Sequence, residues 1–317
     1  MAVDLYGPAP KVTRENFVEV LDEITRHPDV IAAHEKWERA DEQWKQLVKE
    51  EASDTDQLLA AVKVRQAREE KDVVFDHVAR LSEDIAWQVG VIEDYTLDTI
   101  GKCTAIDDVE ELSVAWHNLR RQGLGGSSLS KLLGLHWMSK PGALEYMTEW
   151  ETDLAWSDAA VEKSHEVYSA WVPEYGVLYR GHCVEPALIA RYAIVHDKRV
   201  AVSKATWRGE NEYQVINLDG IILDDDGNPE GVLECKTSSR DWTWQWGVPV
   251  HYRVQVLWYL RALGFKYADV AVRFDSGVFG VYRIYANETI DGTDNTRTIE
   301  QCVPELEERW EHLRYLV

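Results

Sequence analysis

The N-terminal third of the chain places apolar residues at helical spacing within long polar stretches. Phe17, Leu21 and Ile24 recur every three or four residues, and glycine and proline are rare in this part of the chain. Ser53 is followed by acidic residues, which is typical of a residue that caps the start of a helix. The pattern predicts several long helices over residues 14–100, with a helical hairpin as one arrangement.

After residue 113 the pattern alternates between helices and strands. A glycine-rich turn, GLGGSS, precedes an apolar helical run, and RGHCVEPALIARYA predicts a further helix. EYQVINLDGIILD and VLECKTSS have strand character and flank the turn signal DDGNPEG, so they predict a β-hairpin. A helix stopped by Gly264, the strands YADVAVRF and GVFGVYRIYA, and the charged helix VPELEERWEHLRYL follow.

This order of elements predicts an α/β (α+β) fold in which a central mixed β-sheet is flanked by helices. We expect residues 1–112 to form an acidic helical region that contacts a partner or a second copy of the chain. Residues 113–317 are expected to form the domain that contains the sheet.

The net charge of −22 excludes a surface that is basic all over, although a local positive path or a bound metal ion still allows nucleic acid to bind. Residues 1–112 hold 13 Lys and Arg against 27 Asp and Glu, so the acidity is concentrated there. We therefore expect this region to contact protein rather than DNA. No apolar stretch of about 20 residues exists and the opening residues lack signal-peptide character, which predicts a cytoplasmic protein without membrane contact.

Four cysteines, Cys103, Cys183, Cys235 and Cys302, are widely separated and form no CxxC pair. This spacing predicts reduced, mostly buried thiols rather than a disulfide framework or a zinc site.

The segment GVLECKTS combines a strand pattern with a charged pair. Because side chains alternate along a strand, Leu233 and Cys235 face one way while Glu234 and Lys236 face the other. One interpretation is a half-exposed strand with a charged outer face. The predicted hairpin favours another, because it brings Asp219 across from Glu234 and so places two carboxylates and an ammonium together.

Such a cluster suits a hard divalent cation. Asp219 and Glu234 supply the oxygen ligands that Mg²⁺ prefers, and the backbone carbonyl of Cys235 can add another. Glu185, on the preceding predicted helix, can complete the shell or help to bind a second ion. A metal-bound water, oriented or deprotonated with help from Lys236, would then attack a phosphodiester.

Together these residues resemble the PD-(D/E)xK nuclease signature, with the aspartate in NLDGII and the ExK in LECKTS. The stretch from Arg120 to about Phe274 resembles, more specifically, the YqaJ-type viral recombinases, which are relatives of the lambda exonuclease. Four segments carry this resemblance in order: RRQGLGGSSLSKLLGL, GHCVEPALIARY, LDGII with ECKTS, and VPVHYRVQVLWYLRALGFKYADVAV. The resemblance covers about half the chain, leaves residues 1–110 unexplained, and implies a restriction-endonuclease-like core.

By this resemblance, Asp219 and Glu234 are metal ligands, Lys236 is the catalytic lysine, and Glu185 is the helix-borne carboxylate of the site. Gln255 corresponds to the helix glutamine of this nuclease class, which orients the site or the scissile strand.

The resemblance also implies a contact between the 5′-terminal phosphate of DNA and Ser127 together with Arg120 or Arg121. A one-residue shift fits either arginine, so both stay open. Tyr252, at helical spacing from Gln255, is expected on the DNA side of the site. Ser128 stands where the family often has an acidic residue, which alters the details of this phosphate pocket.

The implied function is a Mg²⁺-dependent exonuclease, with Mn²⁺ as a substitute and two ions bound, that resects linear double-stranded DNA 5′ to 3′. It leaves 3′ single strands for phage recombination. The implied partners are DNA ends, a single-strand annealing or recombinase protein, and further copies of the chain in a ring-shaped trimer. The implied setting is the cytoplasm of a bacterial cell, with a phage or prophage gene.

Three alternatives stay open. One is a DNA endonuclease, and another is a RecB-like nuclease that carries an iron–sulfur cluster on four cysteines. The third, from a different class, is a non-catalytic regulator that binds DNA or protein. The run WTWQW, with Trp242, Trp244 and Trp246, suits either base stacking or core packing.

Overall fold

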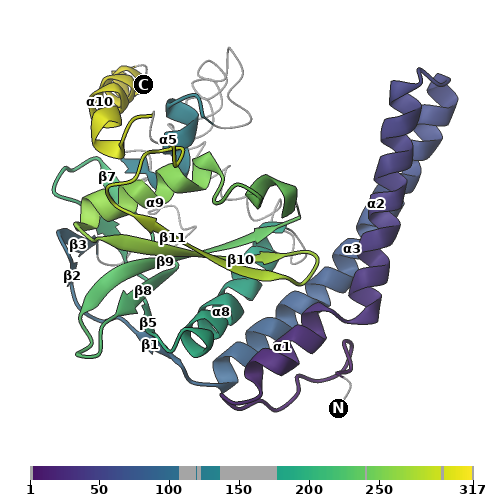
Figure 1. Cartoon of the computed structure of the whole chain (residues 1–317), viewed down its shortest axis with the longest axis horizontal. Coiled ribbons are helices and arrows are strands. Elements are labelled where there is room, and N and C mark those ends of the chain that lie inside the picture. Colours follow the sequence, from purple (N-terminus) through teal and green to yellow (C-terminus); the bar gives the residue numbers. More distant parts are fainter. Residues whose placement is uncertain are drawn as a thin grey trace.

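The computed structural model describes residues 3–106, 119, 123–135, 177–239, 241–293 and 296–315. Figure 1 shows a body built around β-sheet, from which a long helical hairpin projects. Two mixed sheets and the helices that cover them make up the body. Within the described residues, no helix is both long enough and apolar enough to cross a membrane.

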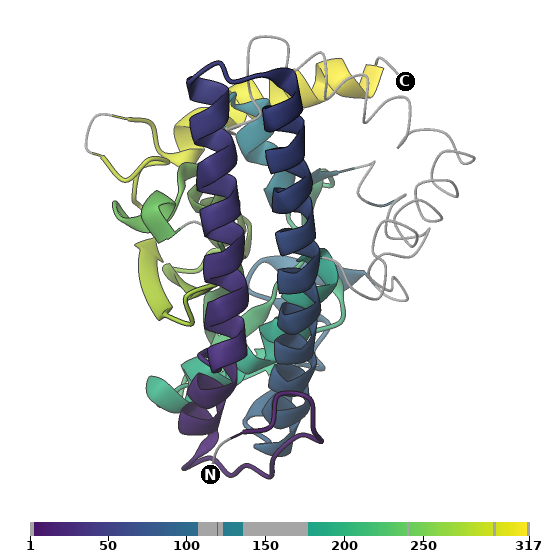
Figure 2. The same cartoon turned by 90° about the vertical axis from the view of Figure 1, so that its right-hand side faces the viewer.

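The projecting hairpin confirms the prediction from the N-terminal pattern. The hairpin consists of α2 (Pro28–Lys49) and α3 (Asp54–Gln88), and α1 (Phe17–Thr25) precedes it. The hydroxyl of Ser53 accepts a hydrogen bond of 3.2 Å from the backbone N–H of Asp56, so the serine caps α3. Figure 2 shows α2 and α3 side by side along their length. The C-terminal part of α3 packs on the body together with α1, whose Phe17 and Ile24 are fully buried.

The main sheet has six strands in the order β1-β5-β8-β9-β10-β11. These are β1 (Ile92–Asp94), β5 (Arg199–Val202), β8 (Gly220–Leu223), β9 (Pro229–Ser238), β10 (Tyr267–Phe274) and β11 (Phe279–Tyr285). The β1–β5 and β9–β10 pairs are parallel and the other pairs are antiparallel. The predicted mixed sheet and the β8–β9 hairpin are therefore confirmed.

A second sheet of five strands has the order β2-β3-β6-β7-β4. Its strands are β2 (Thr99–Ile100), β3 (Cys103–Ile106), β4 (Leu124–Gly125), β6 (Thr206–Arg208) and β7 (Gln214–Ile216). The strands of residues 92–106 follow the N-terminal helices in sequence, yet β1 joins the main sheet and β2 and β3 join the second. β1 and β3 thus pair with strands from the C-terminal two thirds of the chain. The expectation of helices up to residue 100 is wrong for residues 92–100, which contain β1 and β2.

Helices cover both faces of the main sheet. Figure 1 shows α9 (Val250–Leu263) on one face and α8 (Val177–Val195) on the other. The short α5 (Gly126–Leu132) and the C-terminal α10 (Ile299–Tyr315) lie beyond α9. As predicted, α9 ends at Gly264, whose φ of +75° is readily adopted by glycine.

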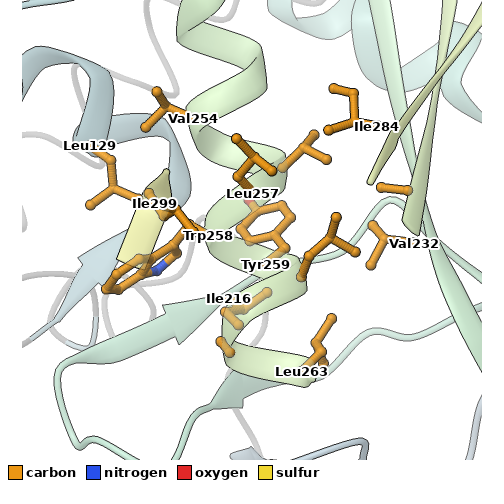
Figure 3. Packing of buried hydrophobic residues seen from close by; sticks show 14 of the residues in the cluster. Leu129, Ile216, Val232, Val254, Leu257, Trp258, Tyr259, Leu263, Ile284 and Ile299 are labelled. Atoms are coloured by element: carbon orange, nitrogen blue, oxygen red, sulfur yellow. The ribbon is translucent and has the colours of Figure 1, made fainter. Parts of the chain in front are cut away.

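The largest hydrophobic cluster lies around α9. Figure 3 shows Leu257, Trp258 and Leu263 of this helix within the cluster, together with Val232 of β9. Leu257 and Trp258 are fully buried, as are most of the other residues of α9, so the helix is covered on nearly all sides. Burial of one such side chain stabilises the fold by about 1.5–3 kcal/mol. The helix therefore holds its polar side chains in fixed positions.

One predicted strand is divided in the structure. The run EYQVINLDGIILD forms β7 in the second sheet and β8 in the main sheet, with a break at residues 217–219. The amide of Asn217 donates a hydrogen bond of 3.0 Å to the hydroxyl of Thr206, which holds the break against β6. Asp219 therefore lies directly before β8, where the chain passes from one sheet to the other, and not within a strand as expected.

Candidate active site

The site is built on β9, which lies in the middle of the main sheet. Glu234 is paired in register with Val270 of β10, and the antiparallel β8 flanks β9 on its other edge. The side chain of Glu234 is only 1% exposed. The interpretation of GVLECKTS as a half-exposed strand with a charged outer face is therefore wrong, because both faces of this strand are covered by helices.

Alternation along β9 sorts its side chains as predicted. Leu233 and Cys235 belong to the hydrophobic cluster beneath α8, whereas Val232 belongs to the cluster around α9. Glu234 therefore faces α9, and Gln255 of that helix contacts it.

Two donors hold one oxygen of the Glu234 carboxylate. Its Oε1 accepts a hydrogen bond of 2.7 Å from Nε2 of Gln255 and a hydrogen bond from the ammonium of Lys236. The other oxygen, Oε2, is buried and has no hydrogen-bond partner among the described residues. A buried carboxylate oxygen without a donor is costly in free energy, so this atom indicates a place for a ligand.

Asp219 lies beside Glu234. Its Oδ2 accepts a hydrogen bond of 2.7 Å from the backbone N–H of Cys235, the residue between Glu234 and Lys236. Burial of Glu234 and the negative charge of Asp219 raise the pKa of Glu234 to about 7, although Lys236 and Gln255 oppose the shift. The two carboxylates therefore share one site, as the hairpin predicted.

The ammonium of Lys236 is held between these acids and an aromatic ring. Burial by itself lowers the pKa of Lys236, but the charges of Glu234 and Asp219 outweigh that effect and raise it. Lys236 is therefore a cation and not a free amine in this arrangement. Its Nζ lies 5.2 Å from the centre of the Tyr252 ring, which is a cation–π distance.

Glu185 approaches this site from α8, on the other face of the sheet. Burial raises the pKa of the Cys235 thiol well above its usual value, and the charges of Asp219, Glu185 and Glu234 add to that shift. Glu185 is therefore within electrostatic range of Cys235. Across the described ranges, however, no three His, Cys, Asp or Glu side chains come together in a cluster able to hold a metal ion.

The donor set nevertheless fits a hard divalent cation. The carboxylates of Asp219 and Glu234 offer oxygen ligands, and the unpartnered Oε2 of Glu234 is the kind of buried atom that such an ion satisfies. Mg²⁺ needs few protein ligands because it keeps several waters. The expected ligation by the backbone carbonyl of Cys235 and by Glu185 stays a prediction.

A contact between α5 and α9 was missed in the sequence. Gly126, the last glycine of the GLGG turn, packs so closely that a Cβ at this position would lie 2.6 Å from the Tyr259 ring and 2.9 Å from Cγ of Gln255. Nε2 of Gln255 also donates a hydrogen bond of 3.0 Å to the Tyr259 hydroxyl. The glycine-rich turn therefore lies against the helix that holds Glu234, and the only sequence signal was the double glycine itself.

Part of the predicted site falls outside the described residues. Arg120 and Arg121 are not described, and the side chain of Ser127 is not described although its backbone lies in α5. Their expected contact with a 5′-phosphate therefore stays a prediction.

The four cysteines are buried free thiols, as predicted. Cys103 and Cys302 lie in the cluster around α9, whereas Cys183 and Cys235 lie in the cluster beneath α8. Because the main sheet separates the two clusters, the four thiols do not converge on one iron–sulfur cluster.

Comparison with known proteins bears on the central part of the chain. Residues 115–266 match the family described as the YqaJ-like viral recombinase domain. The uncharacterized protein YqaJ of Bacillus subtilis (strain 168) is 29% identical over 156 residues, which are 48% of this chain and 43% of that protein. The chain thus matches less than half the length of this relative.

Two solved structures also resemble the chain. They are the alkaline exonuclease LHK-Exo from Laribacter hongkongensis, at 17% identity and a TM-score of 0.43, and LHK-Exo in complex with dAMP, at 16% identity and a TM-score of 0.44. Each alignment covers 64% of this chain and 96% of the other. The resemblance to YqaJ-type recombinases expected from the sequence motifs is confirmed by the family match and the Bacillus relative.

Proposed function

Because residues 115–266 match the YqaJ-like viral recombinase domain, we propose that this protein is a Mg²⁺-dependent DNA exonuclease whose active site lies at Asp219, Glu234 and Lys236. The observation that carries the proposal is the buried Glu234 carboxylate. It has one oxygen held by Lys236 and Gln255 and one oxygen without a partner among the described residues.

Asp219 and Glu234 would hold the ion, with Mn²⁺ as a substitute and with Glu185 and the Cys235 carbonyl as further candidate ligands. When bound, such an ion stabilises negative charge on a phosphodiester and lowers the pKa of a coordinated water. A second ion is expected from the family resemblance.

The protein groups around this position have separate tasks. Lys236 donates a hydrogen bond to Glu234, and its ammonium would stabilise negative charge on the phosphate. Gln255 keeps the Glu234 carboxylate in one orientation, and the Tyr259 hydroxyl in turn accepts a hydrogen bond from Gln255. These contacts keep Glu234 in place before substrate arrives.

The proposed substrate is the end of linear double-stranded DNA, cut 5′ to 3′ to leave a 3′ single strand for phage recombination. Arg120 or Arg121 with Ser127 would bind the 5′-phosphate. The proposed partners are a single-strand annealing or recombinase protein and further copies of the chain in a trimeric ring. The proposed setting is the cytoplasm of a bacterial host that carries the phage or prophage gene.

The test is cleavage of matched DNA forms. We expect Mg²⁺ or Mn²⁺ to support digestion of linear duplex but not of covalently closed circles, and EDTA to abolish it. Strands labelled at the 5′ or the 3′ end report the polarity, and light scattering reports whether the chain is a trimer.

Substitutions test the assignment of the site. Lys236→Ala and Glu234→Ala are expected to abolish digestion, whereas the matched control Lys102→Ala removes an exposed lysine, paired with Glu210, and leaves it intact. Equal cutting of circles would replace the exonuclease by an endonuclease. Absence of cleavage with every divalent metal would leave the non-catalytic regulator.

A further inference from the structure

The WTWQW segment beyond β9 has one buried and two exposed indoles. Trp244 is 2% exposed and is anchored by ring contacts with Tyr252, Phe274 and Tyr282, at centroid distances of 5.7, 5.9 and 5.5 Å. Trp242 is 66% exposed and Trp246 is 90% exposed. The two flanking indoles are therefore exposed to solvent on either side of the packed Trp244.

The segment around Trp244 is fixed to the main sheet by hydrogen bonds. The carboxylate of Asp241 accepts a hydrogen bond of 2.9 Å from the hydroxyl of Ser276. The carbonyl of Ser238, the last residue of β9, accepts a hydrogen bond of 3.0 Å from the backbone N–H of Asp275. The exposed indoles thus project from an ordered turn, η1 (Asp241–Trp244), and from the residues just after it.

The packed residues around Trp244 are connected to the active site through the ring of Tyr252. Tyr252 contacts both the buried Trp244, at a ring-centroid distance of 5.7 Å, and the ammonium of Lys236, at 5.2 Å. A phosphate bound at Lys236 would therefore lie next to Tyr252, the ring that joins the site to the packed residues around Trp244. A strand leaving the site in this direction would present its bases to Trp242 and Trp246.

Exposure of large indoles has a cost, because burial of apolar area is favourable by roughly 25 cal/mol per Å². Among the tryptophans whose exposure the structure describes, only Trp87 is comparably open, at 55%, and it lies near the C-terminal end of α3. Two such residues flank Trp244, whose neighbour Tyr252 contacts Lys236, and they therefore point to a ligand with flat apolar faces.

We propose that Trp242 and Trp246 form a stacking site for unpaired bases of the DNA strand whose phosphodiester lies at Lys236. Every base has a flat π face, so indoles grip a strand without reading its sequence, which suits an enzyme that digests DNA of any sequence. This inference rests on the proposed nuclease function and adds to it the single-strand contact. Loss of the two indoles would weaken the grip on the strand without changing the metal ligands.

The experiment measures binding separately from cleavage. A fluorescein-labelled oligo-dT is titrated with the full chain in EDTA, and its anisotropy is followed for the wild type, Trp242→Ala, Trp246→Ala and the control Trp87→Ala. We expect Trp242→Ala and Trp246→Ala each to bind the oligonucleotide at least about five-fold more weakly than the wild type, since stacking contributes on the order of 1–3 kcal/mol per base. The control Trp87→Ala is expected to bind like the wild type. An abasic oligonucleotide is expected to bind all four proteins equally.

The outcomes separate this inference from the proposed function. The stacking site alone would be overturned if the wild type digests linear DNA while Trp242→Ala and Trp246→Ala bind oligo-dT with affinities within two-fold of the wild-type affinity. A change of oligomeric state in Trp246→Ala with unchanged DNA affinity would also overturn it, because the surface would then contact another protein chain. Unaltered melting temperatures establish that the variants are folded.

Discussion

The contact of Gly126 with α9 gives a sharp test of how the site is held. A methyl group at Gly126 would lie 2.6 Å from Cε1 of Tyr259 and 2.9 Å from Cγ of Gln255. Restoring an ordinary contact of 3.4 Å requires a shift of about 0.8 Å. Tyr259 is only 4% exposed and packs in the core around α9, so its ring has little room to move away.

We therefore expect Gly126→Ala to displace α5 against α9 and to move Gln255 away from Glu234. Overpacking of this kind costs about 1–3 kcal/mol of unfolding free energy. A misplacement approaching 1 Å at a catalytic group costs on the order of 100-fold in rate. The expected result is a loss of about 10- to 100-fold in digestion of linear duplex DNA, together with a modestly lowered melting temperature.

The matched control is Gly181→Ala. Gly181 lies in α8, and a Cβ there would meet no atom of the described structure within 4 Å. Alanine is favoured over glycine within a helix by about 0.5–1 kcal/mol, so this variant should melt slightly higher and digest DNA like the wild type. If Gly126→Ala behaved like Gly181→Ala in both assays, the inferred coupling of α5 to the site would be refuted.

Three further predictions concern β9 and the cysteines. Cys235→Ser places a hydroxyl in an apolar cluster and is expected to lower the unfolding free energy in urea by about 1–3 kcal/mol, with cleavage retained. Loss of cleavage by a variant that is still folded would contradict this. Hydrogen bonds from Lys198 and Tyr267 lower the pKa of Glu230, so its stabilisation is present above the usual glutamate pKa and fades as the pH falls. The stability difference between wild type and Glu230→Gln should thus shrink between about pH 5 and pH 3, and a constant difference would count against the contact. Burial raises the pKa of Cys103 to about 12, so its thiol should resist Ellman's reagent at pH 8 until guanidinium unfolds the chain.

Most elements of the fold were predictable because they depend on local pattern. Helical periodicity and the Ser53 cap predicted the α2–α3 hairpin, and the turn after Leu223 predicted the pairing of β8 with β9. These signals involve residues close in sequence, whose conformations are limited by capping, turn geometry and alternation.

The pairing of β1 and β3 with later strands was not predictable. The strands within residues 92–106 are short, and the partners of β1 and β3 lie about 100 residues away in sequence. The break at Asn217 was missed for the same reason, because β7 and β8 look like one strand until two different sheets compete for them. Short strands are specified by their neighbours more than by their own residues.

The sequence alone determined which chemistry is available, since an aspartate, an ExK strand and a helix glutamine are readable in one dimension. The tertiary structure decided the state of these groups. It buried Glu234 in the middle of a helix-covered sheet, left its Oε2 without a partner among the described residues, and placed the ammonium of Lys236 against its Oε1. It also placed Gly126 against Gln255 and left Trp246 open to solvent. Burial and charge proximity depend on segments that meet only after folding, which is why no local pattern could specify them.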